Sequence, residues 1–405
     1  TFARRLLQDI VCVPELSDAT VSLMDTNPER LALMSKFANK LARDTGTNIK
    51  IETTPDRREA LDGSDYVLTT IRVGDSYERD IAIPLKYGVD QSVGDTVGPG
   101  GVFKALRTAP VLMDICEDIE DVAPDATLLN YTNPMAIACW AMAEATSVPT
   151  IGLCHSVQRT TADLADYIGV SPDRVKGWVA GINHLSWFLR FEVDGQDAYP
   201  QLFEAMENPE IFSRDTVRFE VMKQFGYFVT ESTRHMSEYT PYFRTNEETI
   251  EDFNLNQIPQ YLQQYTTRDD GHETQLLEDA NTDKKLTATR SEEYACRIIE
   301  AMESDRPTVI NGNVPNEGLI DNLLNLSSVE VPILIDKLGF HPMAVGELPG
   351  QLAALSRSNQ AVQQLATQAI LDGDREAAFH AIALDPLTSA VLSLGEIRAM
   401  FDEMW

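Results

Sequence analysis

The first half of the chain alternates short hydrophobic runs with longer segments whose hydrophobic positions recur at helical spacing. Residues 21–25, 49–54 and 66–71 are short runs of the kind that form strands, and residues 28–44 show helical periodicity. Strands that alternate with helices in this way form parallel sheets. The pattern therefore predicts an α/β fold with a Rossmann-like, doubly wound sheet.

Two more strands are predicted in this half, at residues 126–134 and 150–156, and each of them ends in polar residues. Ligands bind to open α/β sheets outside the carboxyl ends of the strands. We therefore expect the functional residues at these polar ends.

The second half has a different hydrophobic pattern, which predicts longer helices and strands that pair with each other. A strand is predicted at residues 187–193, paired strands at 308–323 and 329–336, and helices over the last seventy residues. We interpret residues 1–186 as a dinucleotide-binding domain and residues 187–405 as an α+β substrate and catalytic domain.

The charge balance narrows the possible partners. The 405 residues include 63 Asp and Glu against 33 Lys and Arg, a formal net charge of −30. Such a chain is repelled by phosphate backbones and by anionic lipid, which excludes nucleic acid and membrane surfaces as main partners. The acids are spread through periodic segments, as on the folded surface of a salt-adapted protein.

Cysteine use and hydropathy point to the cytoplasm. Five cysteines with irregular spacing do not form a disulfide framework, which favours a reducing compartment. No run of 18 or more apolar residues is present to span a membrane, and the first residues lack the features of a signal peptide.

Asp25 is the candidate for binding a dinucleotide. In a Rossmann-like fold a glycine-rich turn follows the first strand, and an acid at the end of the second strand binds the ribose hydroxyls. Asp25 ends the predicted strand 21–25, so the turn falls before Thr1. We expect the first strand and its turn to be missing from this chain. The alternative is that Asp25 only caps the helix that begins at Pro28.

Four segments hold unusual clusters of polar and small residues. They are GDTVGPGG (94–101), NYTNPM (130–135), GLCHSVQ (152–158) and GINH (181–184). Cys154 and His184 within them offer a soft sulfur and an imidazole, which suit a divalent transition metal. Alone, a cysteine or a histidine is more often a structural residue.

Together these segments resemble glycoside hydrolase family 4, the NAD- and metal-dependent glycosidases. The resemblance continues through YFVTES (227–232), EYTPYF (238–243) and GNVPNEGLIDNL (312–323). Within that family the chain most resembles the melibiase-type α-galactosidases. It departs from the family pattern at its start, where the glycine-rich turn is absent.

The resemblance implies roles for particular residues. Cys154 and His184 match the ligands of the catalytic cation, usually Mn²⁺. Asn133 matches an asparagine that contacts substrate and the metal site, and it is also expected to bind the cofactor. Tyr239 corresponds to the general base, while His155 and Glu231 occupy further catalytic positions. Arg107 and Asp95 are candidates for binding substrate hydroxyls, or else members of structural ion pairs.

The implied chemistry is an oxidation followed by an elimination. NAD accepts hydride from C3 of the sugar, a base removes the C2 proton, and the C1–O bond breaks. Water then adds and the hydride returns. The expected partner is a small-molecule α-galactoside, and the expected assembly is a homo-oligomer, a dimer or a tetramer.

Three alternatives remain open. An α-galacturonidase of the same family shares QSVGDTVGPGG and NYTNP with this chain. A dehydrogenase of the malate or lactate type would share the cofactor half but would not need a Cys–His metal pair. A non-catalytic sugar-binding relative would bind galactosides without turnover.

The acidic composition generates the first prediction, which concerns salt. Self-repulsion among 63 acids destabilises the fold most at low ionic strength, where the Debye length is about 30 Å at 0.01 M. The melting temperature should therefore rise markedly between dilute buffer and molar salt. A thermal melt that is flat or falls with salt would contradict this account of the acidic surface.

Overall fold

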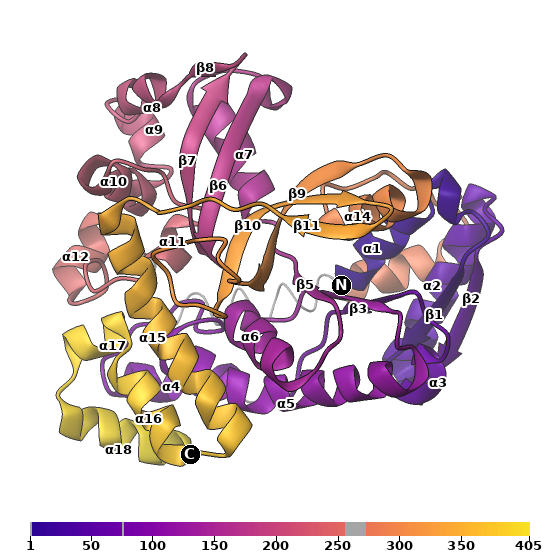
Figure 1. The fold of residues 1–405 in the computed structure, drawn as a ribbon, viewed down its shortest axis with the longest axis horizontal. Helices are drawn as coiled ribbons and strands as arrows, with labels where there is room; N and C mark the ends of the chain where they lie inside the picture. The colour runs from indigo at the N-terminus through magenta and orange to yellow at the C-terminus, as the bar shows by residue number, and fades with distance from the viewer. Residues whose placement is uncertain (1, 75–76, 256–272) are drawn as a thin grey trace.

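A mixed sheet forms the centre of the molecule (Figure 1). The computed structural model describes residues 2–74, 77–255 and 273–405. Within them, the sheet has nine strands in the order β3–β4–β5–β9–β10–β6–β7–β8, with β11 beside β10. The predicted α/β class is confirmed.

The first βαβ unit lies apart from this sheet, at the indigo end of Figure 1. Strands β1 (Thr20–Met24) and β2 (Lys50–Thr54) pair in parallel across helix α2 (Pro28–Thr45). Helix α1 (Phe2–Ile10) packs against α2, and the short helix α3 (Arg57–Leu61) packs against both strands. The short helix η1 (Pro14–Leu16) contacts α14 (Tyr294–Ser304).

Three parallel strands open the main sheet, as the sequence predicts. They are β3 (Tyr66–Thr69), β4 (Thr127–Asn130) and β5 (Thr150–Gly152). The connecting helices are α4 (Tyr77–Lys86), α5 (Gly98–Val122) and α6 (Met135–Ala145).

Late strands enter the sheet between early ones. Strands β9 (Thr308–Pro315) and β10 (Ser328–Asp336) pair with each other in antiparallel fashion and lie between β5 and β6 (Val175–Ile182). Beyond β6 follow β7 (Leu185–Val193) and β8 (Gln196–Asp197), whereas β11 (Gly339–Pro342) pairs with β10. The strand pair expected at 308–323 and 329–336 is thus confirmed, with a shorter first strand.

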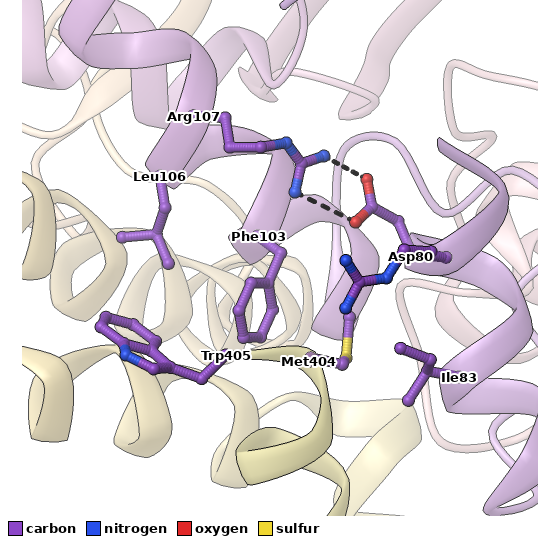
Figure 2. A pocket seen from close by; sticks show the side chains of 8 residues that line it. Asp80, Ile83, Phe103, Leu106, Arg107, Met404 and Trp405 are labelled. Carbon is purple, nitrogen blue, oxygen red and sulfur yellow. Dashed lines mark hydrogen bonds and ion pairs between the residues drawn. The ribbon is translucent and has the colours of Figure 1, made fainter. Parts of the chain in front are cut away.

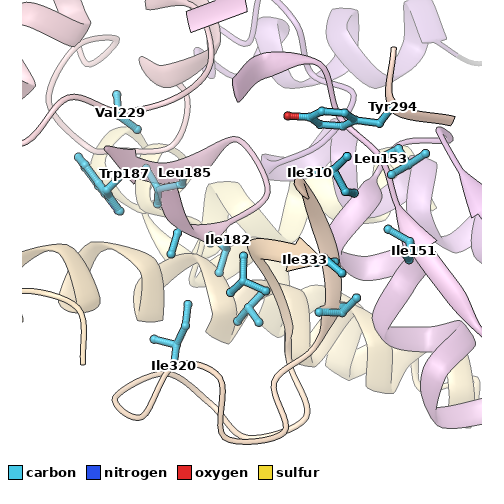
Figure 3. Close-up of a cluster of buried hydrophobic side chains, with 14 of the residues drawn as sticks. Ile151, Leu153, Ile182, Leu185, Trp187, Val229, Tyr294, Ile310, Ile320 and Ile333 are labelled. Atoms are coloured by element: carbon cyan, nitrogen blue, oxygen red, sulfur yellow. The ribbon is translucent and has the colours of Figure 1, made fainter. Parts of the chain in front are cut away.

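One hydrophobic core runs across these strands (Figure 3). Ile151 of β5, Ile310 of β9, Ile333 of β10 and Ile182 of β6 all belong to the same buried cluster. The sheet is therefore continuous across residue 186, which itself lies within β7. The division into domains at that residue stays a prediction.

Helices cover the rest of the molecule. Helix α15 (Gly350–Asp372) packs on α5 and α6 and begins the predicted C-terminal helical region, drawn in yellow in Figure 1. This region continues with α16 (Arg375–Ala383), α17 (Pro386–Val391) and α18 (Leu394–Met404). The other described helices are α7 (Ser156–Tyr167), η2 (Pro172–Arg174), α8 (Tyr199–Ala205), α9 (Pro209–Phe212), α10 (Thr216–Phe225), α11 (Thr233–Met236), α12 (Glu247–Asp252) and α14 (Tyr294–Ser304).

In the part of the chain that the structure describes, none of the helices combines the length and the apolar character that a bilayer crossing requires.

Two leucines test how far α15 supports the sheet. Leu352 is completely buried in the core cluster of the sheet, whereas Leu338 is 88% exposed. Leu352→Ala should lower the free energy of unfolding by about 2–5 kcal/mol, because it removes buried methyl groups and leaves a cavity. Leu338→Ala should stay within about 0.5 kcal/mol of the wild type. Denaturant titration measures both, and equal effects would show that α15 does not depend on this contact.

Candidate active site

Three metal-binding side chains meet at the ends of the central strands. The Sγ of Cys154, a ring nitrogen of His184 and a carboxylate oxygen of Glu231 all lie within 4.8 Å of one another. Cys154 and His184 are buried, and Glu231 is half-buried. The structure thus brings together the two predicted metal ligands and one residue that the sequence assigned to catalysis.

A tight hairpin positions His184. Strands β6 and β7 pair up to Ile182 and Leu185, so Asn183 and His184 alone form the connecting turn. His184 has φ = 64°, a left-handed conformation that usually selects glycine or asparagine. Gly181 permits the close approach, because a Cβ there would lie 2.6 Å from the carbonyl oxygen of Leu185. A histidine in a strained turn position is typical of a functional site.

Glu231 is held opposite this hairpin by the edge of β7. Val229 forms a bridge with Trp187, and the Thr230 N–H donates to the Ser186 carbonyl oxygen over 2.8 Å. The next residue, Glu231, then lies beside His184, with its Oε2 3.4 Å from the Nε2 of His184. Glu231 also has a left-handed backbone, with φ = 76°.

Cys154 lies in the loop between β5 and α7. The N–H of Leu153 donates to the Asn130 carbonyl oxygen over 2.8 Å, which extends the parallel pairing of β4 and β5 towards Cys154. The Sγ of Cys154 is 3.3 Å from the Oγ of Ser156, the first residue of α7. Cys154 therefore stands where ligands of open α/β sheets bind.

The charges of this cluster are strongly coupled. Burial alone would lower the pKa of His184, but Glu231 and Cys154 raise it to about 10. Burial would raise the pKa of Glu231, yet His184 and His235 lower it to about 2. A divalent cation would take over the role of the imidazolium proton between these groups.

Tyr239 lies beside the cluster, in the core. It is 1% exposed, and its ring contacts His235 with centroids 5.2 Å apart and His184 with centroids 6.4 Å apart. Its hydroxyl has no hydrogen-bond partner among the described residues. Burial, followed by the charges of Glu231 and Asp95, raises its pKa well above the ordinary value. The phenol is therefore protonated at neutral pH unless a cation lies nearby.

Other buried polar atoms are also without partners. Both side-chain amide atoms of Asn183, in the hairpin turn, lack a hydrogen-bond partner among the described residues. Buried polar groups are nearly always satisfied in native proteins. With the Tyr239 hydroxyl, Asn183 thus provides groups that a polyhydroxylated ligand could satisfy.

Asp95 approaches the cluster from the loop before α5. Its carboxylate accepts hydrogen bonds from the Thr96 hydroxyl over 2.8 Å and from Lys104 over 3.2 Å. Burial would raise the pKa of Asp95, but Lys104, His235 and His184 lower it to about 2. Asp95 is consequently ionised, with Lys104 as its structural partner.

His155 and Asn133 follow the carboxyl ends of two neighbouring strands, β5 and β4. His155 precedes α7 and is exposed, and its ring centroid is 6.5 Å from that of Phe2. Asn133 is half-buried in the turn between β4 and α6. Their predicted roles are compatible with these positions and stay predictions.

Arg107 is engaged elsewhere. It lines a pocket of about 310 Å³ between α4, α5 and α18, where its guanidinium pairs with the carboxylate of Asp80 (Figure 2). Trp405 and Phe103 line the same pocket. The described contacts therefore match the alternative of a structural ion pair, and binding of substrate by Arg107 stays a prediction.

Asp25 lies at the carboxyl end of β1. Its carboxylate accepts the N–H of Asn27 over 2.8 Å, and it is Asn27 that caps α2 by accepting from Glu29 and Arg30. The side chain of Asp25 is 30% exposed. Asn27 therefore caps α2 in place of Asp25, and the carboxylate of Asp25 stays accessible to a ligand.

Sequence reasoning missed His235, Glu238 and Asn183. His235 and Glu238 are buried and three residues apart at α11, and His235 lies directly against His184. In HMSEY, His235 precedes Glu238 by three residues and Tyr239 by four, a helical spacing that could have linked His235 to both of them. Asn183 lies within the GINH segment, directly before the predicted ligand His184.

Comparison with known protein families decides the identity. The family model described as "Family 4 glycosyl hydrolase" matches residues 1–170. A second model, described as "Family 4 glycosyl hydrolase C-terminal domain", matches residues 179–388. The chain belongs to glycosyl hydrolase family 4. The family predicted from its motifs is therefore confirmed.

Curated relatives refine this assignment. The chain is 41% identical over 410 residues to an α-galactosidase of Bacillus subtilis (strain 168), covering 100% of this chain and 94% of that protein. It is 36% identical over 417 residues to an α-galactosidase of Rhizobium meliloti (strain 1021), covering 100% and 85% respectively. The chain is thus similar over its whole length to two proteins of the predicted α-galactosidase branch.

Solved structures confirm the fold. A putative glucosidase from Bacillus subtilis superposes with a TM-score of 0.89 at 25% identity, over 100% of this chain and 96% of that chain. A 6-phospho-β-glucosidase from Thermotoga maritima, solved with manganese, NAD⁺ and glucose-6-phosphate, gives a TM-score of 0.81 at 21% identity, over 100% and 95%.

Substitution of the two strand-end ligands tests the cluster. Cys154→Ser or His184→Ala should weaken Mn²⁺ binding and lower glycoside hydrolysis by at least two orders of magnitude, about 3 kcal/mol of barrier. Cys12→Ser is the matched control, because Cys12 is a half-buried free cysteine outside the cluster. Titration calorimetry under a thiol reductant measures binding. Wild-type binding and turnover in either ligand variant would contradict the metal assignment.

Proposed function

We propose that this chain is an NAD- and Mn²⁺-dependent α-glycosidase that hydrolyses small α-galactosides. The observation that carries the proposal is the cluster of Cys154, His184 and Glu231 in a chain of this family. Full-length similarity to two α-galactosidases supports the choice of sugar.

The described residues fit a divalent cation. A thiolate, an imidazole and a carboxylate form a mixed donor set that suits transition metals, and the three ligand atoms already converge. Unpartnered polar atoms of Asn183 and Tyr239 accompany them. Cys154 and His184 would hold the cation, with Glu231 at its side.

The described residues also fit a dinucleotide. Asp25 presents an accessible carboxylate at the carboxyl end of β1, where ribose hydroxyls bind in Rossmann-like folds. An acid at this position favours NAD, because it would repel the 2′-phosphate of NADP. When bound, NAD would supply a hydride acceptor for C3 of the sugar, and the cation would act as a Lewis acid on the neighbouring oxygens.

Tyr239 is the residue that would remove the C2 proton. Its hydroxyl is buried without a partner, next to the ring of His184. The negative charges of Glu231 and Asp95 keep that hydroxyl protonated, so it becomes a base only when a positive charge offsets them. His155 and Glu231 are the alternative candidates for moving the proton.

An α-galacturonidase is the alternative activity. Two α-galacturonidases are 27% and 30% identical to this chain, against 41% and 36% for the two α-galactosidases. Hydrolysis of aryl α-galactoside and aryl α-galacturonide, compared with NAD, Mn²⁺ and a thiol reductant present, separates the two. Binding of either sugar without turnover would instead favour a non-catalytic sugar-binding protein.

Localisation and assembly complete the proposal. The five free cysteines, with the buried Cys154 among the proposed ligands, suit a reducing compartment, and we place the protein in the cytoplasm. A homo-oligomer, a dimer or a tetramer, is the proposed assembly.

Isotope exchange at C2 tests the mechanism. If a base removes the C2 proton, hydrolysis in D₂O should give galactose that carries deuterium at C2. Displacement with two carboxylates never breaks the C2–H bond, and a dehydrogenase leaves the glycosidic bond intact. Mass spectrometry of the product measures incorporation, and substrate deuterated at C2 should react more slowly if proton removal limits the rate. An active enzyme with neither incorporation nor an isotope effect at C2 or C3 would contradict oxidation and elimination.

Two tyrosines test the identity of the base. Tyr239→Phe should lower kcat and C2 exchange by about 10²–10⁴-fold, the usual contribution of a positioned acid or base. Tyr242→Phe is the matched control, because Tyr242 lies three residues away and is 49% exposed. Persistent exchange in Tyr239→Phe would transfer the role to His155 or Glu231.

A further inference from the structure

A row of buried side chains leads away from the proposed metal site. The Nδ1 of His184 is 3.0 Å from the Nε2 of His235, and the two rings meet edge to face with centroids 4.9 Å apart. On the far side of His235, its Nδ1 lies 3.6 Å from the Oε2 of Glu238, which is within ion-pair distance but longer than a direct hydrogen bond. All three side chains are nearly inaccessible to solvent, with Glu238 completely buried.

Geometry decides where the protons of this row lie. The Nε2 of His184 faces Glu231 and the cluster, so this nitrogen needs its lone pair when a cation is bound. The Nδ1 of His184 then carries the ring proton and donates it to the Nε2 of His235. His235, in turn, must keep Nε2 as an acceptor and carry its own proton on Nδ1, which points towards the carboxylate of Glu238.

Glu238 is fixed independently of the two histidines. Its Oε1 accepts the N–H of Val93 over 2.7 Å and the Ser92 hydroxyl over 3.0 Å, and its Oε2 accepts the N–H of Gly94 over 3.1 Å. Arg244, also buried, donates to Ser92 and pairs with Asp90. The carboxylate therefore has little freedom to move, and it stays ionised next to His235.

We propose that His235 and Glu238 form a positioning relay that selects the tautomer of His184 and aims its Nε2 at the cation. The proposal rests on the metal site of the proposed function. The relay touches neither substrate nor cation and acts through His184 alone. Because Glu238 also binds the backbone of the loop that leads to Asp95, the relay connects that loop to the metal ligand.

Nuclear magnetic resonance of the wild-type protein tests the tautomers directly. The chain contains only six histidines, so selective ¹⁵N labelling of the imidazole rings gives a tractable spectrum. In reduced protein loaded with Zn²⁺, a diamagnetic probe, His184 and His235 should each show a protonated Nδ1. A protonated Nε2 on either ring would overturn the proposal, and this result does not depend on any variant folding.

Metal affinity tests the energetic role of His235. His235→Leu should raise the dissociation constant for Mn²⁺ by about 10- to 100-fold, as is usual when the partner of a ligating histidine is lost. His235→Gln should recover most of the affinity, because an amide oxygen can accept the His184 proton where Nε2 did. An unchanged dissociation constant in a folded His235→Leu protein, or a His235→Gln variant as weak as His235→Leu, would overturn the relay.

A second histidine–carboxylate pair supplies the matched control. His341 is exposed and lies 2.9 Å from Asp336 in the β10–β11 hairpin. His341→Leu should bind Mn²⁺ as tightly as the wild type. A loss equal to that of His235→Leu would show that the effect is general and would overturn the proposal.

The same samples separate the relay from the proposed function. If wild-type protein binds Mn²⁺ through Cys154 and turns over α-galactoside while His235→Leu binds equally well, the relay alone fails. If His235→Leu loses affinity as expected but wild-type protein hydrolyses no glycoside with NAD present, the relay stands and the proposed function fails.

Discussion

A half-buried carboxylate, a buried thiol and a buried imidazole within 4.8 Å of one another constitute the constraint on which the site depends. Burying ionisable groups costs free energy unless opposite charges or a metal compensate them. In the described structure the positive charge comes from His184, whose pKa is raised to about 10 by Glu231 and Cys154 in spite of its burial. A divalent cation held by Cys154 and His184, with Glu231 at its side, would replace that proton, so metal binding would offset the free-energy cost of burying these charges.

The order of strands in the sheet brings these three groups together. Because β9 and β10 enter between β5 and β6, the end of β5 with Cys154 and the β6–β7 turn with His184 belong to one sheet. Single pairs of residues, Gly152 with Asn313 and Glu330 with Gly181, tie the late strands to the early ones. The site is therefore built across both halves of the chain, and the backbone strain at His184 and Glu231 is supported by that shared core.

Periodicity and motifs predicted much of this, for physical reasons. The parallel strands β3, β4 and β5 follow from short hydrophobic runs separated by helices, and Cys154 follows from a polar segment at a strand end. The insertion of β9 and β10 between β5 and β6 could not be predicted, because periodicity identifies a strand but not its neighbour in the sheet. Arg107 illustrates the same limit, since its partner Asp80 lies on another helix, 27 residues earlier in the chain.

His235 and Glu238 show a different limit. Their contacts to His184 and to the Val93–Gly94 backbone join segments that lie far apart in sequence. A helical spacing suggests that the two residues are neighbours, but only the fold shows that they stand behind a metal ligand. The resemblance to a family assigned roles to groups near the reaction and left these supporting residues unassigned.

Anomalous scattering at the manganese absorption edge tests the central claim most directly. Crystals of the reduced protein grown with Mn²⁺ and NAD should give a strong anomalous peak between the Sγ of Cys154 and the Nε2 of His184, next to Glu231. The peak should vanish from crystals of the Cys154→Ser protein grown in the same way. A wild-type map without a peak at these three residues, or with manganese bound only elsewhere, would contradict the account.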